Sequence, residues 1–193
     1  IVLRVDSPGG DALAADLIAE LLRKGNGKKP IIVSQGYVAA SGGYWLSMFA
    51  DTIVAAPNTI TGSVGVIGSF MFNKSLKQTL GLSVDHVQKG KFADLGFGAT
   101  LPLIGVSIPD RDFTDEELKM AETGIKTLYK GFVEKVALGR KKSFDDIEKI
   151  AQGRVWSGSD GLKNGLVDVL GGLDDAIKIA LQKTNLTNSE YEI

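Results

Sequence analysis

The chain has 193 residues, enough for one domain with a sizeable core, and its 44% hydrophobic and 23% charged fractions are those of an ordinary soluble globular protein. Its formal net charge of −1, without a basic block, gives no indication of nucleic-acid binding. The lack of cysteine excludes a thiol nucleophile, disulfide bonds and thiolate metal sites, and the single histidine, His86, cannot build a multi-histidine metal site.

The start of the chain indicates a fragment of a longer protein. It begins Ile1-Val-Leu-Arg-Val-Asp6, within a predicted strand and without an initiator methionine. No apolar run approaches the ~18 residues of a transmembrane helix, and no signal peptide is visible. We therefore expect any targeting or anchoring segment to lie in the missing N-terminal part.

The N-terminal part predicts a strand–turn–helix–strand unit. Residues 1–6 form a buried strand, which Ser7-Pro8-Gly9-Gly10 ends because proline cannot donate to a sheet and glycine permits a tight turn. A second buried strand follows at 30–35 and is broken by Gly36. This order favours parallel strands with a right-handed crossover. The helix between them, residues 12–23, gathers its apolar residues on one broad face: Leu13, Ala14, Leu17, Ile18, Leu21 and Leu22.

The rest of the chain predicts further strands and helices and one long loop. The longest helix runs from 114 to about 138, starting at a capping threonine followed by three acids, and we expect it to pack inward through Met120, Ile125, Leu128, Phe132, Val133 and Val136. The other predicted elements are a strand at 51–56, a helix at 70–80, a strand at 83–88, a loop at 89–111, a helix at 143–150, a strand at 166–169, a closing helix at 174–183 and a polar tail at 184–193.

Ser41 lies where a predicted strand gives way to a predicted helix, in Ala39-Ala-Ser-Gly-Gly43. Its small neighbours leave the hydroxyl little steric cover, and the unpaired amides of a first helical turn favour a nearby anion. A hydroxyl placed there could attack a carbonyl, with the oxyanion held by backbone N–H groups. The same pattern also fits a tight turn whose small residues serve only close packing.

Four ordered motifs together carry more information than any one of them. They are Asp6-Ser-Pro-Gly-Gly10, Ala39-Ala-Ser-Gly-Gly-Tyr-Trp45, Ala56-Pro-Asn-Thr-Ile-Thr-Gly-Ser-Val-Gly65, and Ala151-Gln-Gly-Arg-Val-Trp156 with Gly165-Leu-Val-Asp168. In this combination the chain resembles the signal peptide peptidase A (protease IV) family of the ClpP/crotonase superfamily. The resemblance implies an α/β fold, a ClpP/crotonase-like superhelix of β-β-α units, forming a single domain over residues 1–183 that is truncated at its N-terminus.

The resemblance also implies roles for single residues. Ser41 is expected to be the nucleophile, and the amides of Gly42 and Gly10 to form the oxyanion hole, with Gly9 as the alternative to Gly10. Ser63 resembles the serine that orients the general-base lysine of the family, although a plain turn hydroxyl fits the sequence as well.

The family's lysine is missing at the expected position. The corresponding segment reads Gly90-Lys-Phe-Ala-Asp94, so that Ala93, which cannot take a proton, stands where the family has lysine. Three explanations compete: the chain resembles the C-terminal half of the long, duplicated form, whose lysine lies in the N-terminal half; Ala93 is an engineered replacement; or Lys89 or Lys91 has taken over the role. A lysine with a pKa near 10.4 acts as a base only where burial lowers that pKa.

The implied activity is hydrolysis of cleaved signal peptides and other hydrophobic peptides, without cofactor or metal. The implied setting is a homo-oligomer anchored in the bacterial cytoplasmic membrane, its catalytic domain outside the cytoplasm, this fragment being soluble. One alternative is a catalytically incomplete scaffold or peptide-binding half, which Ala93 favours. Another is a crotonase-like acyl-thioester enzyme, which the pairing of Ser41 with Ser63 and the lack of a CoA-phosphate cluster argue against.

The remaining polar and aromatic candidates have simpler interpretations. His86 is interpreted as a surface or hydrogen-bonded histidine rather than a catalytic one. The acids Asp51, Asp94 and 115–117 are not expected to bind a metal, and those at 115–117 fit the start of a helix. Four aromatic residues fit either a substrate groove or the core, with the core favoured for the second of them: Tyr44, Trp45, Phe92 and Phe97.

Overall fold

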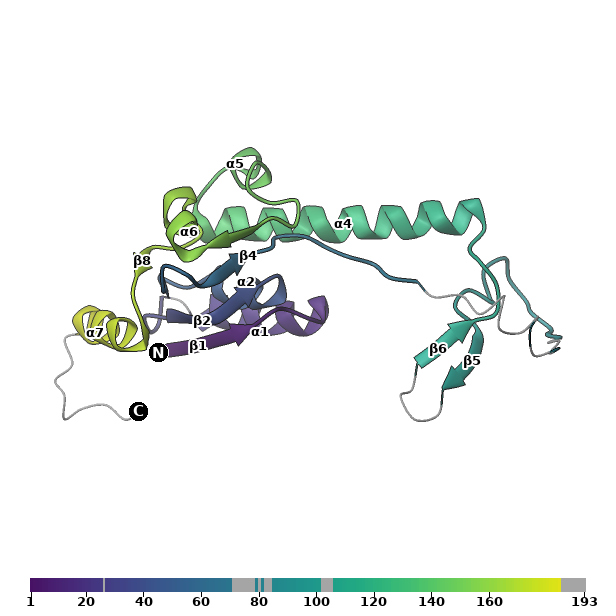
Figure 1. The fold of residues 1–193 in the computed structure, drawn as a ribbon, viewed down its shortest axis with the longest axis horizontal. Helices are drawn as coiled ribbons and strands as arrows, with labels where there is room; N and C mark the ends of the chain where they lie inside the picture. Colours follow the sequence, from purple (N-terminus) through teal and green to yellow (C-terminus); the bar gives the residue numbers. More distant parts are fainter. Residues whose placement is uncertain (26, 71–78, 80, 82–84, 102–105, 185–193) are drawn as a thin grey trace. The chain divides into compact units, whose positions relative to one another are not determined.

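A computed structural model describes residues 1–25, 27–70, 79, 81, 85–101 and 106–184 of the chain (Figure 1). They belong to two compact units, Ile1–Val66 with Leu128–Ile193, and Ile67–Thr127. None of the helices among these residues is both long enough and apolar enough to cross a membrane.

The first unit is built on a six-stranded sheet, which is parallel except for one strand. β1 pairs with β2, β2 with β3 and β4, and β3 with β8, all in parallel, whereas β7 is antiparallel to β4. The parallel pairing of β1 and β2 across a helix confirms the predicted strand–helix–strand unit. The strands are β1 (Val2–Ser7), β2 (Ile32–Ala40), β3 (Thr52–Ala55), β4 (Ile60–Gly62), β7 (Val155–Ser157) and β8 (Val169–Leu170).

The central strand β2 changes its partner along its length. Residues Ile32–Ser34 pair with β3 and residues Val38–Ala40 pair with β4, while β1 occupies the opposite edge. The change occurs at Gly36, whose carbonyl accepts a 2.8 Å hydrogen bond from Thr59 Oγ1. The prediction that Gly36 ends the strand was therefore wrong. Glycine is needed there for another reason, because a Cβ at this position would lie 2.5 Å from Asp6 Cγ.

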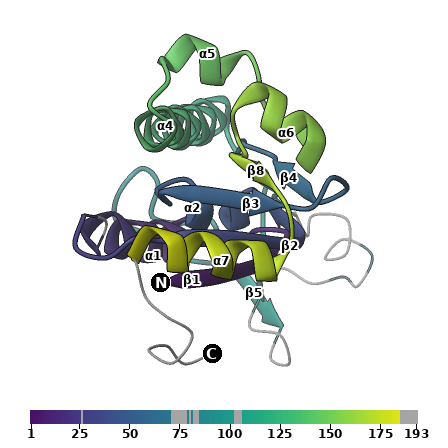
Figure 2. The same cartoon turned by 90° about the vertical axis from the view of Figure 1, so that its left-hand side faces the viewer.

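Helices cover both faces of this sheet. The main core packs Trp45 against Phe132, with ring centroids 4.0 Å apart, and a smaller core holds Ile32 and Val54 against Ala176. α4 and α5 lie together on one side of the strands (Figure 2). The helices are α1 (Ala12–Gly25), α2 (Gly42–Ser47), α4 (Asp115–Arg140), α5 (Phe144–Glu148), α6 (Gly158–Asn164) and α7 (Leu173–Thr184).

Two helices form as predicted, but not all of their large apolar residues are buried. In α1 the buried residues are Ala15 and Ala19, while most of the large apolar residues are exposed. In α4 the predicted inward residues Phe132, Val133 and Val136 are buried, but Met120 and Leu128 are about half exposed, so their assignment to the core was wrong. Periodicity located both helices, but it identified the buried side only in the C-terminal part of α4.

The second unit contains a hairpin, β5 (Gly98–Leu101) and β6 (Val106–Pro109), and the first turns of α4. The hairpin lies inside the predicted loop 89–111, which was thus too long. Nearly all of the predicted helix at 70–80, the first residues of the strand at 83–88 and nearly all of the tail at 184–193 lie outside the described residues. Residues 85–88 are described and are not part of a strand, so the strand prediction was wrong for them.

The predictions of four shorter elements hold, with small shifts. β3, α5 and α7 match the predictions at 51–56, 143–150 and 174–183. Ser143 caps α5, since its side chain accepts a 3.1 Å hydrogen bond from Asp146 N. The strand predicted at 166–169 is observed as β8, three residues further on.

Candidate active site

Ser41 lies at the junction between β2 and α2 in a strained backbone conformation. Its φ of 52° and ψ of −120° fall where residues other than glycine are rare, and such residues concentrate at functional sites. Its N–H donates to the Gly62 carbonyl at 2.9 Å, and its carbonyl accepts from Trp45 N at 2.9 Å. The junction is thus held from β4 and from the first turn of α2.

The Ser7–Gly10 turn packs directly against the Ser41 junction. A Cβ on Gly9 would lie 2.8 Å from Ser41 Cβ and 2.9 Å from Gly42 N. A Cβ on Gly42 would lie 3.2 Å from Gly10 N. The two glycine-rich motifs therefore meet with their backbones in contact, which larger residues would prevent.

Hydrogen bonding distinguishes the two glycines of the turn. The Gly9 amide donates to Ser7 Oγ at 3.2 Å, whereas the amides of Gly10 and Gly42 have no acceptor among the described residues. Gly43 lies behind them, since a Cβ there would collide with the Ser7 carbonyl oxygen. Where the turn and the Ser41 junction meet, each motif thus contributes one amide without an acceptor among the described residues.

Ser63 occupies the equivalent position on the next strand. Gly62 of β4 pairs in parallel register with Ala40 of β2, so Ser41 and Ser63 each follow a paired position at the same edge of the sheet. Ser63 also has a positive φ, 50°, and its N–H donates to the Arg154 carbonyl at 2.8 Å. Among the described residues, neither serine hydroxyl has a hydrogen-bond partner.

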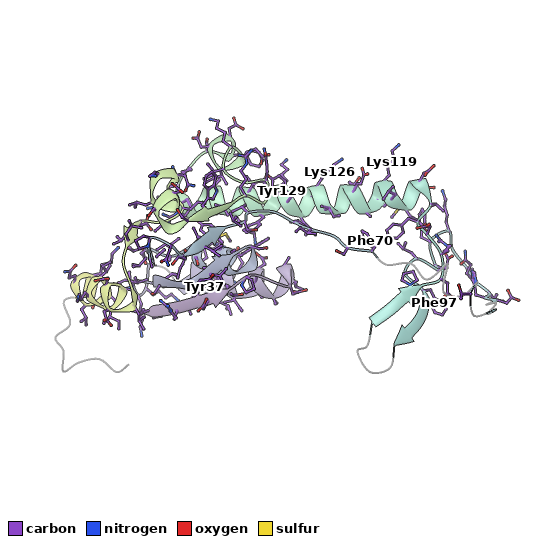
Figure 3. The ribbon with its side chains drawn as sticks, in the orientation of Figure 1. Tyr37, Phe70, Phe97, Lys119, Lys126 and Tyr129 are labelled. Carbon is purple, nitrogen blue, oxygen red and sulfur yellow. The ribbon has the colours of Figure 1, made fainter. Side chains whose placement is uncertain are left out.

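α4 supports the segment behind Ser63 through Tyr129. The Tyr129 hydroxyl donates to Glu148 at 2.5 Å and accepts from Gln152 N at 3.2 Å, and Gly153 N in turn donates to the Val64 carbonyl at 2.9 Å. Burial, together with the Glu148 carboxylate, raises the pKa of Tyr129 to about 12, so the phenol stays protonated and keeps donating. Tyr129 lies in the part of α4 that belongs to the first unit (Figure 3).

The aromatic residues after Ser41 belong to the core, as favoured for Trp45. Tyr44 is completely buried and its hydroxyl donates to the Leu166 carbonyl at 3.0 Å; burial raises its pKa. Trp45 stacks on Phe132 and its Nε1 donates to Asp16 at 3.1 Å. Their role is to fix α2, and with it the orientation of Ser41, rather than to line a groove.

Ala93, the residue at the expected lysine position, is exposed and belongs to the second unit, as do the two neighbouring lysines. Lys91 forms an ion pair with Glu116 at the surface, lies 5.4 Å from the centre of the Phe92 ring, and its side chain is 67% exposed. Lys89 is exposed as well. Both lysines are therefore surface residues of the second unit.

An ion-pair cluster in the second unit was not predicted. Arg111 binds Asp94 and Glu117 at once, each through two hydrogen bonds of 2.6–2.8 Å. Glu117 also forms a capping box with Thr114 at the start of α4. The hydrogen bonds from Arg111 lower the pKa of Asp94 and bring that of Glu117 to about 2. The capping box was visible in the sequence, but the distant partner Asp94 was not.

The other candidates have structural or surface positions. His86 is exposed and its Nε2 lies 3.1 Å from Gln88 Oε1. Asp51 Oδ2 accepts a 2.8 Å hydrogen bond from Ile31 N, which explains this acid without a metal. Phe97 is 64% exposed (Figure 3). Among the described residues, no three histidine or acidic side chains gather closely enough to hold a metal ion.

Comparison with known proteins identifies similar chains. Residues 23–187 match the model of a family described as peptidase family S49. The chain is 40% identical over 185 residues to a chloroplastic serine protease SPPA of Arabidopsis thaliana, and 41% identical over 187 residues to protease 4 of Salmonella typhi. Each match covers 96% of this chain but only 26% and 28% of these relatives, so the chain spans about a quarter of their length.

The fold also has a counterpart among solved structures. A point mutant of ClpP1 from Listeria monocytogenes superposes with a TM-score of 0.57 at 15% identity, over 92% of this chain and 76% of that chain. At this identity the likeness concerns the fold alone, and it confirms the predicted ClpP-like architecture.

Proposed function

Because this chain belongs to peptidase family S49, we propose that it is the nucleophile-bearing domain of a serine peptidase. The observation that carries the proposal is the contact between the Ser7–Gly10 turn and the Ser41 junction. It leaves a strained serine beside two amides, those of Gly10 and Gly42, without described acceptors. This is the arrangement that acyl transfer through an oxyanion requires.

In the proposed reaction, Ser41 Oγ attacks the peptide carbonyl carbon while a neutral lysine amine takes the hydroxyl proton. The negative charge that develops on the carbonyl oxygen is stabilised by the amides of Gly42 and Gly10. The C–N bond then breaks, the lysine returns the proton to the leaving amine, and an acyl-enzyme remains on Ser41. Water, deprotonated by the same lysine, attacks the ester, and the peptide acid leaves as Ser41 regains its proton.

We propose that the lysine comes from outside this chain and that Ser63 orients it. Ser63 follows Gly62 of β4, which pairs with Ala40, the residue before Ser41. The Ser63 hydroxyl has no partner among the described residues. Ala93 supplies no base, and Lys91 is exposed and ion-paired. The named relatives are nearly four times longer than the matched region, which leaves room for a second half that carries a lysine.

The proposed substrates are cleaved signal peptides and other hydrophobic peptides, processed by a membrane-anchored homo-oligomer outside the cytoplasm. This part of the proposal depends on the family resemblance of the motifs around Ser41. The small residues there, Ala39 and Ala40, favour an S1 pocket for small or aliphatic side chains.

A fluorophosphonate probe tests the nucleophile and the base separately. We expect an adduct on Ser41, located by mass spectrometry, in the longer protein that contains this chain, and none in its Ser41→Ala variant. The isolated chain should remain unlabelled for want of a base. Labelling of the isolated chain would contradict an external base and place it within these 193 residues.

The second candidate function is a non-catalytic scaffold or peptide-binding domain, favoured by Ala93. It predicts no adduct in either the isolated chain or the longer protein. Binding of a hydrophobic peptide without turnover, unchanged in Ser41→Ala, would then be the supporting result.

A further inference from the structure

The loop at 151–154, which precedes β7, holds the backbone of Ser63 and Val64. The N–H of Ser63 donates to the Arg154 carbonyl at 2.8 Å, and the N–H of Gly153 donates to the Val64 carbonyl at 2.9 Å. These two bonds continue the antiparallel pairing of β4 with β7 beyond the ends of both strands. A serine has one side-chain torsion that moves its oxygen, so the backbone fixes where that oxygen can lie. The position of the Ser63 hydroxyl therefore depends on the position of this loop.

The loop has a backbone conformation that one of its residues does not favour. Gln152 and Gly153 both have a left-handed φ, 60° and 75°, and for Gln152 this conformation is unfavourable because its Cβ is crowded there. The loop also packs closely on the segment after Ser63, since a Cβ on Gly65 would lie 2.7 Å from Gly153 Cα. A residue other than glycine keeps such a conformation only where its surroundings hold it. Contacts from outside the loop are therefore needed at Gln152.

Tyr129 of α4 supplies such a contact within the first unit. Its hydroxyl accepts a 3.2 Å hydrogen bond from the Gln152 N–H and donates to Glu148 of α5 at 2.5 Å. The Gln152 side chain donates to the same carboxylate at 3.4 Å, so the three residues form a closed ring of hydrogen bonds. The Tyr129 ring packs against the main core, which includes Phe132 one turn further along α4. A well-packed helix thus holds the loop at the residue next to Gly153.

We propose that Tyr129 is a positioning residue: through Gln152 and its loop, it holds Ser63 where the Ser63 hydroxyl can orient the general-base lysine. The inference deepens the proposed function and rests on it, because Ser63 has a lysine to orient only in that reaction. A hydrogen bond between the two groups needs a length of about 2.7–3.2 Å. A shift of about 1 Å in a catalytic group can cost about 10²-fold in rate, so a small displacement of the loop should be measurable in kcat.

Tyr129→Phe, introduced into the longer protein that contains this chain, keeps the ring in the core and removes both hydrogen bonds of the hydroxyl. We expect kcat for hydrolysis of a hydrophobic peptide to fall ~10–100-fold. KM should change less than about threefold, because Ser63 acts on the base and not on the substrate. The value of kcat is calculated per Ser41 that a fluorophosphonate labels at completion, so that unfolded molecules do not contribute to it.

A double-mutant cycle with Ser63→Ala shows whether Tyr129 acts through Ser63. Ser63→Ala alone should lower kcat. Tyr129→Phe added to it should lower kcat by no more than about twofold further, since the hydroxyl that Tyr129 positions is already gone. Two losses that multiply would mean that Tyr129 acts independently of Ser63, and they would overturn the inference.

Two control variants separate positioning from a purely structural role of Tyr129. Tyr37→Phe removes the hydroxyl of a tyrosine that is 72% exposed, and it should leave both kcat and stability unchanged. Ile32→Val shortens a fully buried residue of the smaller core, so it should lower stability without changing kcat. An equal fall of kcat in Ile32→Val would show that lost stability alone explains the effect of Tyr129→Phe, which would contradict the inference.

The same measurements distinguish a failure of this inference from a failure of the proposed function. If the longer wild-type protein is labelled at Ser41 and hydrolyses the peptide, but Tyr129→Phe has the wild-type kcat, then Tyr129 is not a positioning residue and the proposed peptidase function stands. If the wild type is neither labelled nor active, the proposed function is wrong and the inference fails with it.

Discussion

Gln35 is a buried amide for which the described residues provide no hydrogen-bond partner. It lies in β2 beside Gly36, where β2 changes its partner from β3 to β4, and it is 2% exposed. Both its Nε2 and its Oε1 are buried, and neither has a partner among the described residues. A buried polar group without a partner costs about 1–3 kcal/mol. Among the described residues nothing offsets the desolvation cost of this amide, so we expect it to lower the stability of the folded unit.

Substitution of Gln35 by Met should raise the free energy of unfolding. Methionine is similarly long and unbranched, loses a comparable rotamer entropy and needs no hydrogen bond, so the packing is retained while the desolvation cost is removed. We expect a gain of about 1–3 kcal/mol, which corresponds to a rise in Tm of ~2–4 °C per kcal/mol for a chain of this size. Urea unfolding at a constant m value would measure it.

Gln182→Met on α7 is the control, because Gln182 is exposed and the two residues have similar helix propensities. Its effect should stay within ~0.5 kcal/mol. A loss of about 1 kcal/mol or more in Gln35→Met would refute the reasoning, since it would mean that the amide has a partner in the folded protein, such as a buried water.

Three further predictions concern the site and the second unit. Gly9→Ala should lower the free energy of unfolding by ~2–4 kcal/mol in the urea assay, because the position combines a φ of 112° with a Cβ 2.8 Å from Ser41 Cβ. The control Gly124→Ala should raise that free energy slightly, because its Cβ would meet nothing within 4 Å. Ser41→Gly should be ~1–3 kcal/mol more stable than Ser41→Ala in thermal unfolding, since glycine alone relieves the positive φ; equal stabilities would show that no strain is present. Arg111 lowers the pKa of Glu117 to about 2, so its stabilisation should be complete above the unfolded value near 4.3 and be lost as the pH falls from there toward 2; hydrogen exchange of residues 90–97 should increase in that window, and the increase should be smaller in Glu117→Gln, where only Asp94 still pairs with Arg111, and absent when Asp94→Asn is added.

The sequence predicted those parts of the fold that depend on backbone shape. The turn at Gly9 and Gly10 and the junction at Ser41 need residues without bulky side chains, and such a need is visible in the sequence itself. The prediction that the strand ends at Gly36 was wrong, although it also depended on a glycine. A glycine there indicates an unusual backbone environment, but not whether the strand ends or, as observed, continues with a new partner.

The side on which a helix packs was harder to predict. The apolar periodicity of α1 points to its leucines, yet the core receives Ala15 and Ala19, since Asp16 bonds to Trp45 on that side. Which side is buried depends on contacts with residues far along the chain. The same limit applies to Arg111, whose partner Asp94 becomes evident only when the turn and the start of α4 are folded together.

The general base is the part of the candidate site that local sequence cannot identify. A nucleophile of this kind is recognisable because its backbone must be strained and closely packed, and Ser41 with its glycine neighbours meets both conditions. A lysine becomes a base through its surroundings, by burial that removes its charge. Lys91 matches the motif but is mostly exposed and ion-paired, and Ala93 has no amine at all. If the proposed mechanism holds, the base is the lysine of the longer protein that becomes buried beside Ser63, and its surroundings rather than its position in the motif identify it.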